Sequence, residues 1–77
     1  MNADEREQSK NVILFLLSPR IPQHRASIEE VLARHSLPVD SGFVDQLIHE
    51  LHSEASIIER DGCYLITHEG MARRLTT

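Results

Sequence analysis

The chain has 77 residues, of which 40% are hydrophobic and 4% aromatic, and its formal net charge is -4 at pH 7. A chain of this length supports one domain with one small, mainly aliphatic core. The longest apolar run, residues 12–17, is too short to span a membrane, and the first residues lack a secretion signal. The single cysteine, Cys63, excludes an internal disulfide and fits a reducing compartment. We therefore expect a soluble, cytoplasmic, single-domain protein.

Residues 1–8 are polar and charged, and we expect a flexible N-terminus there, followed by one domain over residues 9–77. A helix is predicted from about Ser9 to Leu17. One apolar stripe would satisfy a small core, but this segment has two. The surplus stripe indicates either a homodimer surface within residues 12–17 or a helix buried on two sides. The stripes are Val12, Phe15 and Leu16 on one side, and Ile13 and Leu17 on the other.

Pro19 and Pro22 end this helix and begin a loop over residues 18–26, because proline cannot continue a helix. A second helix is predicted over residues 27–35. Its start resembles a capping box, in which the Ser27 hydroxyl and the Glu30 carboxylate satisfy each other's backbone amides. Its predicted buried stripe is Ile28, Val31, Leu32 and His35.

A third helix is predicted over residues 40–54, with Asp40 as its N-cap. Apolar side chains recur on one side of this helix and polar side chains on the other. The predicted buried face is Phe43, Val44, Leu47, Ile48, Leu51 and Ala55. The predicted outer face is Asp45, Gln46, His49, Glu50, His52 and Ser53.

Two short strands are predicted next, over residues 56–60 and 63–67, joined by Asp61-Gly62. This dipeptide favours a two-residue type I′ turn, which needs positive φ at both positions. The turn sets a register in which Arg60 lies opposite Cys63. A last short helix is expected over residues 69–75, capped by Thr67.

This order of elements resembles that of small bacterial winged helix-turn-helix regulators. Residues 31–37 resemble the second helix and turn of that fold, residues 43–51 its recognition helix, and residues 57–70 its wing. The resemblance implies an α+β fold: a winged helix-turn-helix with a three-helix core, a C-terminal two-stranded β-hairpin wing and a short terminal helix. It covers residues 9–75 without assigning a family within the fold, which hosts DNA readers and protein-interaction modules alike.

For a DNA-binding member, the resemblance implies that the third helix enters the major groove and that the wing touches the DNA backbone. The function expected from it is that of a transcriptional regulator or accessory factor. The candidate DNA-binding residues on the third helix are Ser41, Gln46, His49 and Ser53. The candidate phosphate-binding residues are Arg20, Arg25, Arg34 and Arg60.

The charge of the third helix departs from this pattern. Residues 40–55 contain no lysine or arginine, although cationic contacts to phosphate supply most non-specific affinity for DNA. The alternative function is therefore an acidic protein-interaction module, an adaptor or inhibitor, whose third helix docks a basic partner. The carboxylates in this segment are Asp40, Asp45, Glu50 and Glu54.

The sequence contains no complete constellation for catalysis or metal binding. His49 and His52 have the i, i+3 spacing of helical metal ligands, but nothing completes a site, and we interpret them as part of a solvated polar face. Cys63, beside a hairpin turn, is interpreted as a small packing residue rather than a nucleophile. There is no glycine-rich phosphate loop and no nucleophile elbow. We expect no enzyme activity, no metal and no cofactor.

Overall fold

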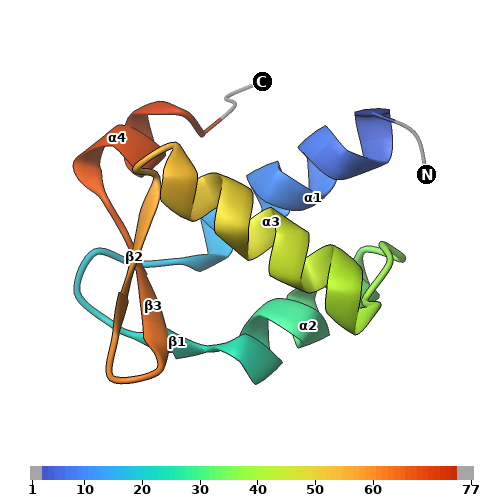
Figure 1. Cartoon of the computed structure of the whole chain (residues 1–77), viewed down its shortest axis with the longest axis horizontal. Helices are drawn as coiled ribbons and strands as arrows, with labels where there is room; N and C mark the ends of the chain where they lie inside the picture. Colours follow the sequence, from blue (N-terminus) through green and yellow to red (C-terminus); the bar gives the residue numbers. More distant parts are fainter. Residues whose placement is uncertain (1–2, 75–77) are drawn as a thin grey trace.

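The computed structural model describes residues 3–74, which form four helices and one three-stranded antiparallel sheet (Figure 1). This α+β arrangement is compatible with a winged-helix-like fold. No helix in the described range is both long enough and apolar enough to cross a membrane. In chain order the elements are α1 (Ala3–Leu16), β1 (Gln23–His24), α2 (Arg25–Arg34), α3 (Ser41–Ser53), β2 (Ile57–Arg60), β3 (Cys63–Ile66) and α4 (His68–Ala72).

The starts of the first two helices differ from the sequence prediction. α1 begins at Ala3, so residues 3–8, predicted to belong to a flexible terminus, are helical; residues 1–2 lie outside the described residues. α2 begins at Arg25, directly after β1, and its N-cap residue is His24. The predicted capping box is wrong, because pairing of β1 starts the helix earlier and leaves Ser27 inside the first turn. Asp40 does occupy the N-cap position of α3, without a side-chain cap hydrogen bond.

α2 and α3 both end in a left-handed residue that is not glycine. Ser36 has φ 57° and Ala55 has φ 60°. After α3, the amide of Ala55 donates to the carbonyl of His52 (3.0 Å) and that of Ser56 to the carbonyl of Leu51 (2.9 Å). This is a Schellman ending, which satisfies the last carbonyls and turns the chain into β2. The left-handed turn points Ala55 into solvent, so its predicted place on the buried face is wrong.

The hairpin follows the prediction, but it is part of a larger sheet. Asp61 and Gly62 have φ 53° and 80°, as a type I′ turn requires. Arg60 lies opposite Cys63, as predicted. The predicted two-stranded wing is corrected to three strands in the order β1-β3-β2, since β1 pairs with the free edge of β3. A strand of two residues has no alternation that a sequence pattern can reveal.

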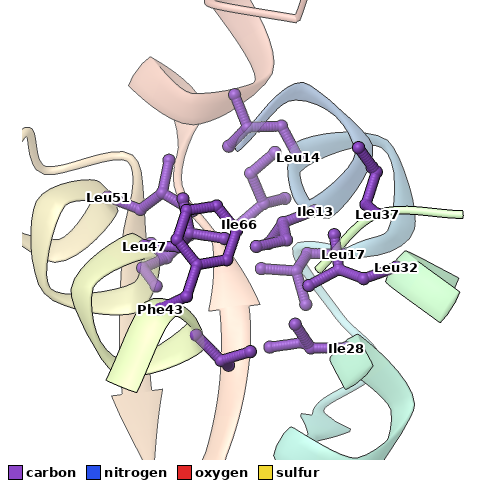
Figure 2. Packing of buried hydrophobic residues seen from close by; sticks show 12 residues of the cluster. Ile13, Leu14, Leu17, Ile28, Leu32, Leu37, Phe43, Leu47, Leu51 and Ile66 are labelled. Atoms are coloured by element: carbon purple, nitrogen blue, oxygen red, sulfur yellow. The ribbon is translucent and has the colours of Figure 1, made fainter. Parts of the chain in front are cut away.

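The core lies where the three long helices meet the inner side of the sheet (Figure 2). Ile13 and Leu17 of α1 are buried there, whereas the Phe15 side chain is 52% exposed. At the other end of the chain, the Thr67 hydroxyl accepts from the Gly70 amide (3.0 Å) and caps α4 as predicted. α4 ends at Ala72, so residues 73–74 of the predicted helix are not helical, and its predicted end at Leu75 lies outside the described residues. The core cluster is Ile13, Leu14, Leu17, Ile28, Leu32, Leu37, Phe43, Val44, Leu47, Leu51, Ile57 and Ile66.

Candidate nucleic-acid interface

The outer face of α3 is a polar stripe that runs the length of the helix. α3 crosses in front of α1 in Figure 1, and its apolar side faces the core. All four α3 residues predicted to contact DNA are exposed, which leaves their hydroxyl, amide and imidazole groups accessible. The exposed residues of α3 are Ser41, Gly42, Asp45, Gln46, His49, His52 and Ser53.

Two carboxylates of the third helix turn away from this stripe and pair with α1. Arg6 forms two contacts with the Glu50 carboxylate, one of them from Nε to Oε2 at 2.8 Å. Lys10 Nζ lies 2.7 Å from Oε2 of Glu54, just beyond the end of α3. The prediction that Glu50 faces outward is corrected: it is half-buried against α1. These pairs keep two of the four negative charges off the exposed stripe.

The contact between Arg6 and Glu50 predicts how stability responds to acid. The hydrogen bond from Arg6 lowers the pKa of Glu50 below the ordinary value of 4.5, against a smaller opposing effect of burial. A lowered folded-state pKa stabilises the protein above the unfolded-state pKa, and this stabilisation is lost as the pH falls through the folded-state value. We expect Glu50→Gln to lower the free energy of unfolding slightly at pH 7 and to flatten its loss between about pH 5 and 3.

Urea unfolding across this pH range measures the effect. Glu59→Gln is the matched control, because Glu59 is exposed on β2 and has no salt bridge within residues 3–74. Identical acid profiles for Glu50→Gln and the wild type would contradict the pairing with Arg6.

Arg25 is the one predicted phosphate-binding residue that touches α3. Its Nη2 donates to the backbone carbonyl of Ser41 (3.0 Å), and its Nη1 donates to the Asp45 carboxylate. Its Nε donates to Oε2 of Glu29 (3.1 Å). The hydrogen bond that Arg25 donates to Asp45 raises the pKa of Arg25 above its ordinary value. Arg25 therefore offsets the charge of Asp45 at the start of α3, but two carboxylates share its guanidinium.

The other predicted arginines belong to three different segments of the chain. Arg34 pairs with Glu30 on the same helix, at 2.6 Å. Arg20 in the α1–β1 loop and Arg60 at the hairpin end of β2 are exposed, and neither forms a salt bridge within the described residues. Within residues 3–74, Arg25 thus hydrogen-bonds to Ser41, whereas Arg20, Arg34 and Arg60 form no salt bridge with α3.

Sequence reasoning missed the cations that neutralise α3, although a signal was present. Arg6 and Lys10 are spaced by four residues, as are Glu50 and Glu54, so each pair lies on one side of a helix. Two such helices can pair their opposite charges turn by turn when packed side by side.

Sequence reasoning also missed a contact between a thiol and an imidazole on the sheet. Sγ of Cys63 lies 3.4 Å from Nδ1 of His24, across the β1–β3 pairing. Only the unpredicted strand β1 brings these side chains together. Within residues 3–74, no three histidine, cysteine, aspartate or glutamate side chains gather in a way that would hold a metal ion.

Comparisons of the chain with protein-family models, with curated proteins and with solved structures found no match.

Proposed function

We propose that this protein is a winged helix-turn-helix DNA-binding protein, a transcriptional regulator or accessory factor, with α3 as its recognition helix. The observation that carries the proposal is the exposed polar stripe of α3. Because Glu50 points to α1, Asp45 is the one carboxylate of this stripe between Ser41 and Ser53. Asp45 is itself paired with Arg25. A helix of this kind fits the major groove without placing a row of negative charges against the phosphates.

The side chains on the stripe have the donors and acceptors needed to read base edges. Gln46, near the middle of α3, suits a bidentate contact with the N6 and N7 atoms of adenine. Ser41, at the first helical position, suits a phosphate, since helix N-termini favour anions. His49 and Ser53 follow on the same exposed side and extend the contact along the groove.

Phosphate contacts in this arrangement come from outside α3. Arg60 lies at the hairpin end of β2, where a wing touches the DNA backbone, and Arg20 lies in the exposed loop before β1. Arg25 supplies a third cation at the start of α3, shared with Asp45 and Glu29. With so few cations and a net charge of -4, we expect weak non-specific affinity that falls with salt.

Fluorescence anisotropy of a labelled random-sequence duplex, at low and at physiological salt, tests this function. We expect binding at low salt that weakens as salt rises, and a further loss in Arg60→Ala and Arg20→Ala. Arg34→Ala is the matched control: it removes the same charge, but from a residue already paired with Glu30. No binding at low salt would contradict the proposal, as would equal losses in all three variants.

A second candidate function, an acidic protein-interaction module, is favoured because some of the predicted phosphate-binding cations already form salt bridges. Arg25 and Arg34, two of the four predicted phosphate-binding arginines, are held by carboxylates of the chain itself. In this case a basic partner would displace Arg25 and meet Asp45, Glu29 and the polar stripe. Salt-sensitive association with a basic polypeptide, together with no binding to the duplex, would select this function over the first.

A further inference from the structure

One ion pair on the exposed stripe of α3 is completed by a different helix. Arg25, at the start of α2, donates from Nη1 to the Asp45 carboxylate and from Nη2 to the Ser41 carbonyl (3.0 Å). Its Nε donates to Oε2 of Glu29 (3.1 Å). A guanidinium is planar, so contacts at all three of its nitrogens fix its position. Arg25 and Asp45 therefore form one group of defined geometry at the start of α3.

This pair keeps hydrogen-bonding groups that the chain itself does not use. A guanidinium has five N–H donors. The contacts of Arg25 within residues 3–74 use three of these donors, so two remain. In the same range the Asp45 carboxylate accepts at Oδ1, which leaves Oδ2. The two side chains are 33% and 61% exposed, so a ligand can reach both.

We propose that the Arg25–Asp45 pair reads one G·C base pair in the major groove. The assignment rests on the DNA-binding function proposed above. Guanine presents two acceptors there, N7 and O6, and its cytosine presents one donor, the N4 amino group. Two N–H donors beside one carboxylate oxygen form the complementary pattern.

The same pattern disfavours an A·T base pair. Across the major groove, this base pair presents an acceptor, a donor and an acceptor: N7 and N6 of adenine, then O4 of thymine. In either orientation, one donor of Arg25 would face the N6 amino group and the Asp45 carboxylate would face an acceptor. Discrimination therefore comes from repulsion at the wrong base pair as well as from attraction at the right one.

The charge of the group favours a base edge over a phosphate. Arg25 is one cation and its two partners, Asp45 and Glu29, are both carboxylates, so the group as a whole is negative. A negative group is repelled by a phosphate, whereas a base edge is neutral. A hydrogen bond to a base edge therefore suits this group better than a direct phosphate contact.

The position of the pair predicts where the G·C base pair lies in the site. Asp45 and Gln46 are adjacent and exposed on the same stripe. Adjacent Cα atoms are about 3.8 Å apart, close to the rise of about 3.4 Å between base pairs. We therefore expect the G·C base pair within about two steps of the adenine proposed for Gln46.

Selection of bound duplexes from a random-sequence pool, followed by fluorescence anisotropy, tests the base contact. We expect the selected duplex to bind about ten-fold more tightly than the same duplex with A·T in place of this G·C base pair. Replacing its guanine with 7-deazaguanine removes the N7 acceptor and should also weaken binding. Inosine is the matched control, because it keeps N7 and O6 and lacks only the amino group in the minor groove.

Arg25→Ala distinguishes a base contact from a phosphate contact. Loss of a base contact brings the affinities for the G·C and A·T duplexes closer together, whereas loss of a phosphate contact lowers both by the same factor. We expect the first result for Arg25→Ala and for Asp45→Ala. Arg60→Ala is the matched control and should give the second, because Arg60 is assigned to the DNA backbone. Far-UV circular dichroism checks that each variant is folded.

The outcomes separate this inference from the proposed function. A wild type that binds the pool without selecting a G·C base pair near the adenine would overturn the inference and leave the proposed function standing. Folded Arg25→Ala and Asp45→Ala variants that keep the wild-type ratio of the two affinities would do the same. A protein that binds no duplex at low salt would overturn both.

Discussion

Replacing Gly70 with alanine is expected to destabilise the protein by about 3 kcal/mol, through overpacking at the junction of α3, the hairpin and α4. A Cβ atom at this position would overlap the backbone carbonyl oxygen of Ser56 and lie 2.7 Å from Cγ1 of Ile66. The overlapped oxygen already accepts a hydrogen bond from the Thr67 amide, at 2.9 Å. Backbone cannot move aside as a flexible side chain can, so α4 would have to leave the sheet.

Gly42→Ala is the matched control for this prediction. Gly42 lies in α3 and is exposed, and a Cβ atom there would meet no atom within 4 Å. Alanine is a better helix former than glycine, so this variant should gain about 0.5 to 1 kcal/mol. Urea unfolding of the two variants measures both effects. A Gly70→Ala variant as stable as the wild type would show that α4 does not pack against Ser56 as closely as described.

The hairpin and the polarity of α3 were predictable because short-range rules decide them. Asp61-Gly62 encodes a two-residue turn, and this turn sets the register of Arg60 and Cys63 without any tertiary contact. The recurrence of Phe43, Leu47 and Leu51 placed the buried face of α3 on the correct side. In each case the signal lies within a few residues along the chain.

The features that escaped prediction depend on contacts between distant segments. β1 exists because Gln23 and His24 meet the free edge of β3, some forty residues later in the sequence. Ala55 is exposed because the chain must turn sharply between α3 and β2. This turn moves Ala55 away from the buried face on which the apolar repeat of α3 would place it.

The charge of the candidate site was also misjudged, for the same reason. Residues 40–55 contain four carboxylates and no lysine or arginine, so the sequence alone predicts an acidic helix. In the folded chain, Glu50 and Glu54 are paired with cations of α1, more than forty residues earlier. The exposed residues of α3 were thus predictable from periodicity, but their electrostatic surroundings required the packing of α1 against α3.

Two adjacent residues of α3 allow its two proposed roles, core packing and DNA contact, to be tested separately. Leu47 is fully buried in the core, and its neighbour Gln46 is exposed on the polar stripe (Figure 2 labels Leu47). Leu47→Ala should lower the free energy of unfolding by about 3 kcal/mol, by leaving a cavity. A domain of this size has a stability on the order of 4 to 12 kcal/mol, so the loss is a large fraction. Leu47→Met, which conserves volume, should cost less than about 1.5 kcal/mol.

Gln46→Ala should show the opposite behaviour. Its free energy of unfolding should stay within about 0.5 kcal/mol of the wild type, because the side chain is exposed. Its affinity for a selected DNA site should fall about ten-fold, through loss of a base contact, while folded Leu47→Met keeps the wild-type affinity. Gln8→Ala, the same change at an exposed position of α1, should alter neither quantity. The buried side of α3 cannot reach the groove in a folded protein, so any base contact must come from its exposed side. Unchanged DNA affinity in Gln46→Ala would therefore show that Gln46 is not part of the interface.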